Sequence, residues 1–484
     1  MNASDQLNRH LALIGFMGAG KSTVGAEVAE RLGRRFVDLD EEIERRSDQT
    51  IAEIFSISEA AFRDLEEQIA CEILAEREPA VIALGGGAVG SERIRSALTE
   101  RALTVLLEVD VETAWKRARG AERPLARDES RFRALFEERQ PVYRACANAS
   151  GRDADDVVLA AGGVHVGVGA LELLGRLVPG DGPVALVADA HVAGIYGPGV
   201  QVALGPRLVS THELPPGEAA KTISACDRLW QELMLDRNGT LVALGGGCTT
   251  DAAGFVAATY LRGIDWVAAP TSLVGQVDAG IGGKTALNLP QGKNLVGAFH
   301  WPARTVIDPS TLETLPQRET EEGMAEAVKT GLLAGEELWA LPPAELVRRC
   351  AATKTALCLR DPYDRGPRAA LNLGHTFAHA LEAGAGYESV SHGRAVGLGL
   401  LAALRLSVEH LGLDGEAPAT VERVLRPRPV RVDRERAWAA LARDKKSAAG
   451  RSRLVLLEAL GRPVTGVELP DDALRAALDA LIAG

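Results

Sequence analysis

Several short apolar runs of the sequence predict buried strands that end at a glycine or an aspartate. They include Leu11–Ile14, Pro183–Asp189 and Leu241–Leu244, which have the length of strands buried on both faces of a parallel sheet. Segments with helical character follow the first and the third of these runs. From Thr320 onward the pattern becomes helical. The pattern therefore predicts α/β domains with parallel sheets, followed by an all-helical C-terminal half.

Composition limits the class of protein. A chain of 484 residues is long enough for two or three domains with hydrophobic cores. The net charge of −12 argues against a nucleic-acid or acidic-membrane binder. No apolar run reaches the roughly 18 residues of a membrane helix, and no signal-peptide pattern precedes the first strand. The six cysteines form no C-x-x-C pair, as is typical of reduced thiols, so we expect a cytoplasmic protein.

The first candidate site is a phosphate-binding loop. Gly15–Thr23 matches G-x-x-x-x-G-K-[ST] between a predicted strand and the helical Val24–Leu32. Lys21 is expected to reach the β and γ oxygens of a nucleotide, and Ser22 to bind Mg²⁺. A chance glycine-rich turn is the alternative. The backbone of the loop supplies the remaining predicted ATP contacts, at Gly18, Ala19, Gly20 and Thr23.

Further residues of this region suit a small acidic acceptor. Asp38 and Asp40 alternate at one strand end, where one carboxylate can organise Mg²⁺ and the other can accept an acceptor hydroxyl. Arg63 and Arg139 offer planar forks for a carboxylate, although each alone could be a solvated surface residue. Gly85, Gly86 and Gly87 allow backbone to approach the acceptor, and Arg123 lies in a polar loop that could close over the transferring phosphoryl group.

A second glycine-rich stretch runs from Leu244 to Phe299. Gly245–Gly247 follow a predicted strand and open a helix, whose N-terminus favours a pyrophosphate. Downstream, Asp278, Lys284, Lys293 and Asn294 lie among further glycines. This mixture suggests backbone packed closely around a phosphorylated ligand.

The helical half contains a candidate metal site. Glu326 and Lys329 share one helix face, and so do His375 and His379, while His392 opens the next segment. Two imidazoles and one carboxylate from three elements are typical of an open Zn²⁺ site. Ordinary core or surface histidines are the alternative. The absence of an H-E-x-x-H motif argues against a protease.

The junction between the two regions begins with the polar segment GRDADD (Gly151–Asp156). Two apolar runs around Gly162-Gly163 then predict a β-hairpin. A last short helix over 155–161 is the alternative. We place the domain boundary between residues 153 and 154.

The motifs of the two regions resemble two families. Residues 1–153 resemble shikimate kinase in the P-loop, FVDLDEEIE (Phe36–Glu44), AFRDLEE (Ala61–Glu67), LGGGA (Leu84–Ala88), RPL (Arg123–Leu125) and RQPVY (Arg139–Tyr143). Residues 154–484 resemble 3-dehydroquinate synthase in Leu244–Phe299, GMAEAVKTG (Gly323–Gly331), RAALNLGHTFAHALE (Arg368–Glu382) and HGRAVGLG (His392–Gly399). This second resemblance favours the hairpin at the junction.

The shikimate kinase resemblance implies a P-loop α/β domain with a parallel sheet flanked by helices, which phosphorylates shikimate with ATP and Mg²⁺. It places Asp40, Arg63 and Arg139 on shikimate, with Gly85–Gly87 beside it, and Asp38 near Mg²⁺. It makes Arg123 a catalytic loop arginine. It also places Lys116 or Arg117 near the adenine.

The synthase resemblance implies an α/β NAD-binding half (154–318) and an all-helical metal-binding half (319–484). The expected reaction is the NAD- and Zn²⁺- or Co²⁺-dependent cyclisation of 3-deoxy-D-arabino-heptulosonate 7-phosphate to 3-dehydroquinate, and a homodimer is expected. The implied NAD contacts are Asp189, Glu218, Lys221, Gly246, Gly247, Cys248, Asp251, Thr271, Ser272 and Lys293. The implied substrate contacts are Arg262, Asp278, Lys284, Asn294, Lys329, Lys354, Arg368, Asn372, Lys445 and Lys446. The implied metal ligands are Glu326, His375 and His392, with Asp278, Lys284, Lys329 and His379 as catalytic groups.

Two departures leave alternatives for the second half. Arg394 replaces the usual glutamate beside the ligand His392, and the stretch 360–366 is less acidic than in the family. The competing hypotheses are a cyclase for another sugar phosphate, a polyol dehydrogenase, or an inactive module. The dense set around Lys284–Asn294 argues against a dehydrogenase, and a carboxylate-binding set of Arg and Lys favours an acidic substrate.

Overall fold

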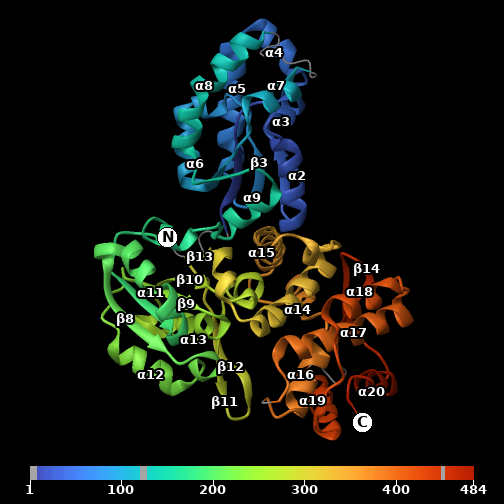
Figure 1. The fold of residues 1–484 in the computed structure, drawn as a ribbon. Helices are drawn as coiled ribbons and strands as arrows, with labels where there is room; N and C mark the ends of the chain where they lie inside the picture. The colour runs from blue at the N-terminus through green and yellow to red at the C-terminus, as the bar shows by residue number, and fades with distance from the viewer. Residues whose placement is uncertain (1–7, 120–127, 388, 448–452, 484) are drawn as a thin grey trace. The chain divides into compact units, whose positions relative to one another are not determined.

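The computed structural model describes residues 8–119, 128–387, 389–447 and 453–483, and from 443 to 447 only the backbone. The chain divides into two compact units, Met1–Gly163 and Val164–Gly484 (Figure 1). Among the described residues, no helix is both long and apolar enough to cross a membrane.

The first unit is built on a five-stranded parallel sheet in the order β2-β3-β1-β4-β5. Its strands are β1 (His10–Ile14), β2 (Arg35–Asp38), β3 (Ala80–Ala83), β4 (Ala102–Leu107) and β5 (Ala149–Gly151). The main helices are α2 (Lys21–Leu32), α3 (Leu39–Ser47), α4 (Ile51–Ile57), α5 (Glu59–Leu74), α6 (Glu92–Arg101), α7 (Val111–Ala118) and α8 (Glu129–Cys146). The central strands β1 and β3 are fully buried, which explains their uninterrupted apolar sequence.

The predicted hairpin at the junction is wrong, and the helical alternative holds. Helix α9 (Ala154–Ala161) begins at Asp153, whose side chain accepts a hydrogen bond from the backbone N–H of Asp156. Its apolar residues pack on β5 and α2, and Asp155 forms a 2.7 Å ion pair with Arg31 of α2. Because α9 packs on elements of the first unit, the two units divide after residue 163 and not after residue 153.

The second unit contains a six-stranded parallel sheet in the order β6-β13-β10-β9-β7-β8. Its strands are β6 (Val164–Val166), β7 (Val184–Asp189), β8 (Leu208–Leu214), β9 (Thr240–Gly245), β10 (Asp265–Pro270) and β13 (Arg304–Ile307). The chain runs from β7 outward to β8, and from β9 in the opposite direction to β10 and β13. The neighbours β7 and β9 therefore flank a topological switch point, where open α/β sheets bind ligands at the carboxyl ends of their strands.

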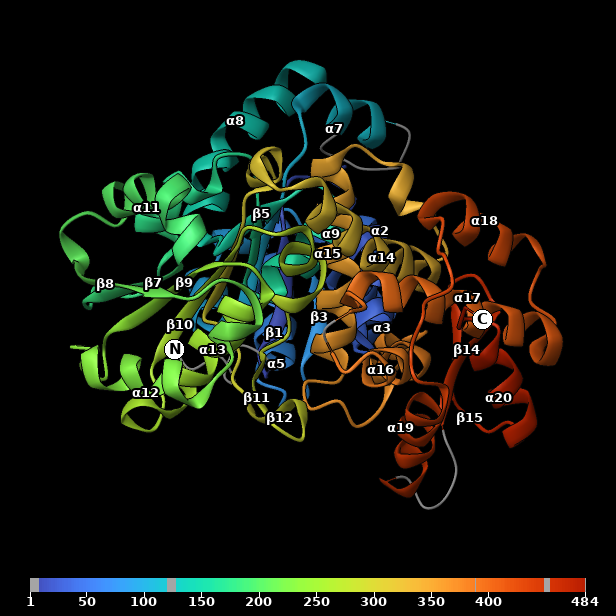
Figure 2. The ribbon, with the colours of Figure 1, turned by 60° about the horizontal axis from the view of Figure 1, so that its bottom comes forward.

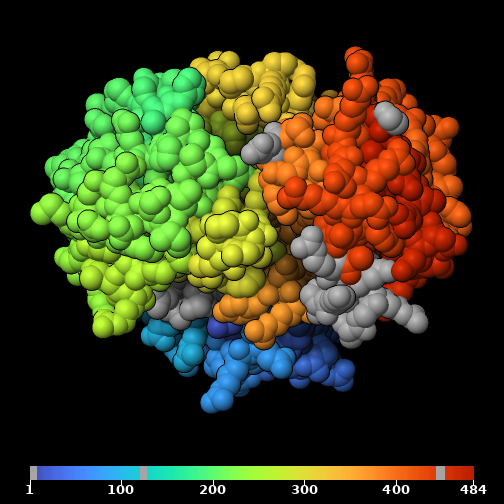
Figure 3. All heavy atoms as spheres, turned by 90° about the horizontal axis from the view of Figure 1, so that it is seen from below, coloured from blue at the N-terminus to red at the C-terminus, as the bar shows by residue number. Residues whose placement is uncertain are grey.

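Helices α11 (Ala190–Leu204), α12 (Ile223–Glu232) and α13 (Gly247–Thr259) cover this sheet. Beside α13 lies an antiparallel hairpin of β11 (Lys284–Leu289) and β12 (Gly292–Phe299). On the face in Figure 3, this hairpin (yellow) lies between the green residues of the sheet half and the orange residues of the helical half. Its lysines contact the helical half, since Lys284 pairs with Asp364 and Lys293 lies 3.7 Å from Glu382.

The described residues of the C-terminal half form helices and one antiparallel hairpin, so the expectation of an all-helical half misses two strands. These are β14 (Leu454–Ala459) and β15 (Arg462–Val467). The helices are α14 (Gln317–Ala334), α15 (Pro343–Arg360), α16 (His375–Gly384), α17 (His392–Leu411), α18 (Glu416–Leu425), α19 (Arg434–Ser447) and α20 (Asp471–Asp479). Helices α16, α17 and α19 pack together, as Figures 1 and 2 both show. The first four residues of β14, Leu454–Leu457, are all buried and join the hydrophobic core of this half.

Candidate active sites

The phosphate-binding loop of the first unit requires glycine. Gly15, Gly18 and Gly20 have φ angles of 144°, 83° and 92°, which residues other than glycine rarely adopt. Gly20 begins α2 without a capping side chain, so the first N–H groups of that helix remain available to an anion. The ammonium of Lys21 donates hydrogen bonds to the carbonyls of Gly15 (2.9 Å) and Phe16 (3.2 Å), which fold it over the loop.

The two residues predicted to bind Mg²⁺, Ser22 and Asp38, contact each other. The Ser22 hydroxyl donates a hydrogen bond to one oxygen of Asp38, and the other oxygen accepts the backbone N–H of Asp40 at 3.0 Å. Asp38 ends β2 and caps α3, so Asp40 lies in the first helical turn and does not alternate with Asp38 on a strand. The helix start nevertheless keeps both carboxylates at the carboxyl edge of the sheet.

The predicted acceptor residues lie together. An added Cβ at Gly85 would come 3.0 Å from Asp40 Oδ1, and one at Gly87 would come 2.3 Å from Arg63 Nη1. The carbonyl of Gly86 accepts hydrogen bonds from Arg139 Nη1 (3.0 Å) and from the hydroxyl of Tyr143. The loop Gly85–Gly87 therefore lies against both arginines that are proposed to bind a carboxylate, Arg63 and Arg139.

Glu66 belongs to this group, although the sequence analysis did not identify it as a site residue. It is 2% exposed, and its Oε2 lies 2.6 Å from Arg63 Nη1. Burial raises the pKa of Glu66, and the charge of Arg63 opposes that rise. The apolar positions Phe62 and Ile69 at helical spacing place Glu66 on the buried face of α5, which is the signal that could have identified it.

Close packing at Gly87 makes a testable prediction. We expect Gly87→Ala to raise the KM for shikimate about tenfold, because the new methyl group would displace the Arg63 guanidinium at a cost of about 1–3 kcal/mol. Steady-state kinetics with shikimate and with ATP measure the effect, and the KM for ATP should stay nearly constant. Gly90→Ala is the matched control, since a Cβ there meets nothing within 4 Å. An equal effect of both substitutions would contradict the assignment.

The structure gives fewer contacts for the remaining predicted nucleotide-binding residues of the first unit. Arg117 is exposed and donates a 3.3 Å hydrogen bond to the carbonyl of Gly18 in the P-loop. Lys116 and Thr23 are exposed, and Ala19 is buried. Arg123 lies outside the described residues.

The predicted dinucleotide residues lie at the switch point of the second sheet. Gly245 has φ of 156°, and a Cβ there would come 2.9 Å from Asp189 Cβ, so the ends of β9 and β7 touch. Gly246 begins α13 without a capping side chain. Asp189 Oδ1 accepts the backbone N–H groups of His191 and Val192, which fixes its carboxylate at the start of α11. Thr271 and Ser272 follow the adjacent β10, and Thr271 N–H donates to the carbonyl of Gly245.

A second group of predicted residues connects η5 (Gly217–Ala220) and the segment after it with the β11–β12 hairpin. Lys221 contacts Asp251 at 2.5 Å and also donates to the Asn294 side chain. Glu218 accepts from Asn288 at 2.7 Å and pairs with Lys293 at 2.9 Å. Cys248, at the start of α13, lies near these charges, and burial raises the pKa of its thiol to about 12.

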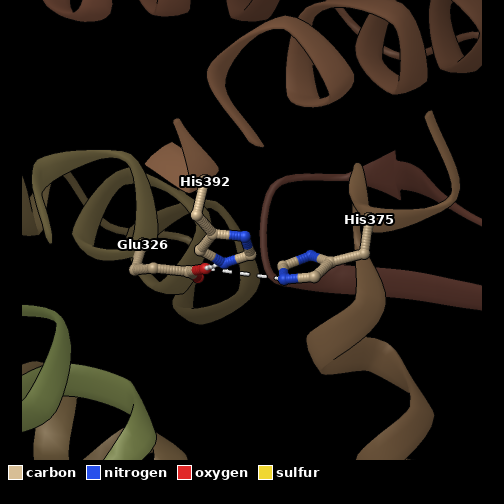
Figure 4. A group of neighbouring side chains, drawn as sticks. All are labelled: Glu326, His375 and His392. Carbon is tan, nitrogen blue, oxygen red and sulfur yellow. Dashed lines mark hydrogen bonds and ion pairs between the residues drawn. The ribbon is translucent and has the colours of Figure 1, made fainter. Parts of the chain in front are cut away.

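The three predicted metal ligands converge (Figure 4). Ligand atoms of Glu326, His375 and His392 lie within 4.8 Å of one another. Glu326 Oε1 is 3.2 Å from His392 Nε2 and 3.5 Å from His375 Nε2. The Nδ1 atoms face other acceptors, namely Glu382 Oε1 (3.3 Å) for His392 and the Leu373 carbonyl (3.3 Å) for His375. Both Nε2 atoms are thus directed at one point, which is the donor geometry that a zinc-like ion requires.

A chain of buried charges adjoins this cluster. Lys329 is 1% exposed and lies 2.5 Å from Glu326 Oε2 and 3.7 Å from Asp278 Oδ1. Lys354 contacts the same Asp278 oxygen at 2.5 Å. Burial lowers the pKa of Lys329, but Asp278 and Glu326 raise it by more, so the ammonium remains charged. Asp278 lies in the π-helical turn η7 (Gly275–Ala279), which thereby connects the sheet half to α14 and α15.

The other residues predicted for substrate binding or catalysis divide into four groups. Lys284 forms a 2.5 Å ion pair with Asp364, and buried Arg368 donates to the carbonyls of Gly282 and Pro362. His379 lies on α16 with its ring 5.6 Å from that of His375. Arg262 and Asn372 are exposed, and their side chains make no hydrogen bond or ion pair within the described part of the chain. The side chains of Lys445 and Lys446 lie outside the described residues.

Comparisons with known proteins bear on both units. The shikimate kinase family profile matches residues 17–160. Profiles for the N-terminal and C-terminal parts of 3-dehydroquinate synthase match residues 211–322 and 323–447. The 3-dehydroquinate synthase of Bordetella pertussis is 39% identical over 342 residues, which cover 65% of this chain and 95% of that protein. The chain belongs to the 3-dehydroquinate synthase family.

Other comparisons agree with this membership. The 3-dehydroquinate synthase of Symbiobacterium thermophilum is 40% identical over 349 residues, covering 66% of this chain and 97% of that protein. A 2-deoxy-scyllo-inosose synthase in complex with carbaglucose-6-phosphate, NAD⁺ and Co²⁺ has the same fold, with a TM-score of 0.59 and 23% identity over 66% of this chain and 96% of that one. ValA, a 2-epi-5-epi-valiolone synthase from Streptomyces hygroscopicus with NAD⁺ and Zn²⁺ bound, has a TM-score of 0.58, 25% identity and the same coverage. The chain thus joins a shikimate kinase domain to a synthase and is a bifunctional shikimate-pathway enzyme.

The two departures from the synthase family pattern lie outside the metal cluster. Arg394 is exposed on α17, and its guanidinium donates to the carbonyls of Arg428 and Pro429, at 3.3 and 3.5 Å, after α18. In the stretch 360–366, Asp361 accepts three backbone N–H groups and Asp364 pairs with Lys284. Arg394 therefore binds the segment after α18 in the helical half. The acidic side chains of 360–366 are engaged in hydrogen bonds or an ion pair.

Proposed function

We propose that both units of the chain are active enzymes with the residues assigned above. The first unit phosphorylates shikimate with ATP and Mg²⁺, and the second converts 3-deoxy-D-arabino-heptulosonate 7-phosphate into 3-dehydroquinate with release of phosphate. The observation that carries the second assignment is the convergence of Glu326, His375 and His392 beside the Asp278–Lys329–Lys354 chain.

In the kinase, catalysis is positioning and charge neutralisation. Lys21 and the free N–H groups of α2 hold the nucleotide phosphates, and Ser22 with Asp38 holds Mg²⁺. Arg63 and Arg139 bind the shikimate carboxylate, and Asp40 accepts the hydrogen bond of the attacking hydroxyl. Glu66 orients the guanidinium of Arg63, since its buried carboxylate contacts one guanidinium nitrogen.

In the synthase, NAD⁺ is expected at the carboxyl ends of β7 and β9, and Zn²⁺ or Co²⁺ between Glu326, His375 and His392. These groups supply hydride transfer and polarisation of a substrate oxygen. The relatives ValA and 2-deoxy-scyllo-inosose synthase bind NAD⁺ with Zn²⁺ or Co²⁺, which supports this pair of cofactors. The NAD-binding groups are the Asp189 and Gly246 strand ends and the set Glu218, Lys221 and Lys293.

The chain's own cations serve the acidic substrate. Lys329 and Lys354 hold Asp278 between them, so this carboxylate is fixed as a hydrogen-bond acceptor for a substrate hydroxyl. Lys284 and Asn294, on the hairpin, and Arg262 are assigned to the phosphate, which carries about −1.5 to −2 at neutral pH. Lys284 must then exchange Asp364 for that phosphate.

Alternatives have less support. An inactive module is disfavoured because the metal cluster and the lysine chain are both intact. We further propose a cytoplasmic enzyme, consistent with its unpaired cysteines, that dimerises through the synthase unit. The net charge of −12 gives no basis for a nucleic-acid partner.

Metal removal tests the proposal. The protein is dialysed against a chelator selective for transition metals and assayed for both reactions with Mg²⁺ present. We expect cyclisation to fall by about 10³-fold, corresponding to the several kcal/mol that a catalytic metal contributes, and to return with Zn²⁺ or Co²⁺. Shikimate phosphorylation should be unchanged. Cyclisation that is absent even with metal and NAD⁺ added would refute the synthase assignment while leaving the kinase assignment intact.

A further inference from the structure

Glu382 is a buried carboxylate beside the metal cluster with no role in the reaction as described so far. It lies on α16 and is 3% exposed. Its Oε1 is 3.3 Å from His392 Nδ1 and 3.7 Å from Lys293 Nζ. A buried carboxylate is costly unless it is paired, so these two contacts account for its position.

The contact with His392 determines which ring nitrogen is available. Because Nδ1 faces Glu382, Nε2 faces Glu326 at 3.2 Å. A carboxylate on the outer nitrogen of a ligand histidine fixes the ring and makes the inner nitrogen a better electron donor. For His375, the group facing Nδ1 among the described residues is the neutral Leu373 carbonyl. The two imidazoles therefore differ in the charge of the group that faces Nδ1, which is a carboxylate for His392 and a neutral carbonyl for His375.

The contact with Lys293 comes from the other half of the synthase unit. Lys293 lies on β12, and its ammonium is 2.9 Å from Glu218 Oε1 and 3.7 Å from Glu382 Oε1. Lys293 thus lies between Glu218, which is assigned to NAD⁺, and Glu382, which contacts the metal ligand His392. Its positive charge competes with His392 for the Glu382 carboxylate.

We propose that Glu382 is the positioning residue of the metal site, orienting His392 toward Glu326, and that Lys293 weakens this support by sharing the carboxylate. The inference rests on the proposed metal function of Glu326, His375 and His392. It makes the β11–β12 hairpin a part of the synthase that adjusts metal affinity.

Opposite effects of two substitutions test the proposal. In the full-length protein freed of metal, Co²⁺ is titrated and its visible absorption gives the affinity and a signature of the ligand geometry. Glu382→Gln should weaken Co²⁺ binding by about 10- to 100-fold and alter the spectrum, because an amide is a poorer acceptor for His392. Lys293→Met should tighten binding by about 2- to 5-fold, the range of one partly exposed charge pair. Glu409→Gln, an exposed residue of α17, should change neither.

The outcomes separate this inference from the function it rests on. If the unsubstituted protein binds no Co²⁺, the metal site itself is refuted. If it binds Co²⁺ and Glu382→Gln leaves the affinity and spectrum unchanged, only the role of Glu382 is refuted. Weaker binding in both variants would indicate a merely structural role and would also overturn the proposal. Should Glu382→Gln fail to fold, Lys293→Met decides alone, since unchanged or weaker binding contradicts the proposal.

Discussion

Replacing Glu326 by Gln is expected to reduce cyclisation by about 10³-fold while shikimate phosphorylation stays unchanged. The amide keeps the volume of the fully buried side chain but removes the negative charge that both imidazoles and Lys329 face. Asp278 remains as a partner for Lys329, so the ammonium is not left without a counter-ion. The loss should therefore arise mainly from metal binding. Parallel assays of both reactions, with metal content measured by atomic absorption, check this result.

The first unit provides the internal reference for that experiment. It is a separate compact unit with its own core, so a change in α14 should not reach it. Glu321→Gln is the matched control on the same helix, because Glu321 is exposed and contacts only Gln317 among the residues described. Cyclisation by Glu326→Gln at more than about a tenth of the normal rate would be incompatible with a ligand role for Glu326.

The local geometry of the candidate sites that the sequence predicted is encoded by local patterns. Gly15–Thr23 follows a strand and opens a helix, so the positive φ angles and the Lys21 position follow from the motif itself. His375 and His379 lie on the same helix, α16, and His392 opens α17, as their spacing in the sequence indicated. Glu326 and Lys329 share a helix face and contact each other.

Other features depend on tertiary packing, which local patterns do not encode. The apolar run 157–161 suits a strand as well as a helix, and the Asp153 cap together with packing on β5 and α2 decides for α9. Glu382 appears in the sequence as an ordinary helix residue, because His392 and Lys293 reach it from distant segments. Likewise, only the structure shows that Arg394 points to the carbonyls of Arg428 and Pro429.

Replacing Lys21 by Met is expected to lower shikimate phosphorylation by about 10²–10³-fold with cyclisation unchanged, the reverse of the Glu326 result. The ammonium is held over the P-loop by two backbone carbonyls, and methionine keeps the length of the side chain but cannot neutralise phosphate charge. Coupled ADP release measures the rate, and equilibrium binding of ATP separates weaker binding from slower transfer. Arg101→Met, an exposed residue at the end of α6, is the control for loss of a surface charge. A parallel loss of cyclisation would show that the two units do not act independently, whereas opposite losses in the Lys21 and Glu326 variants would establish two separate active sites in one chain.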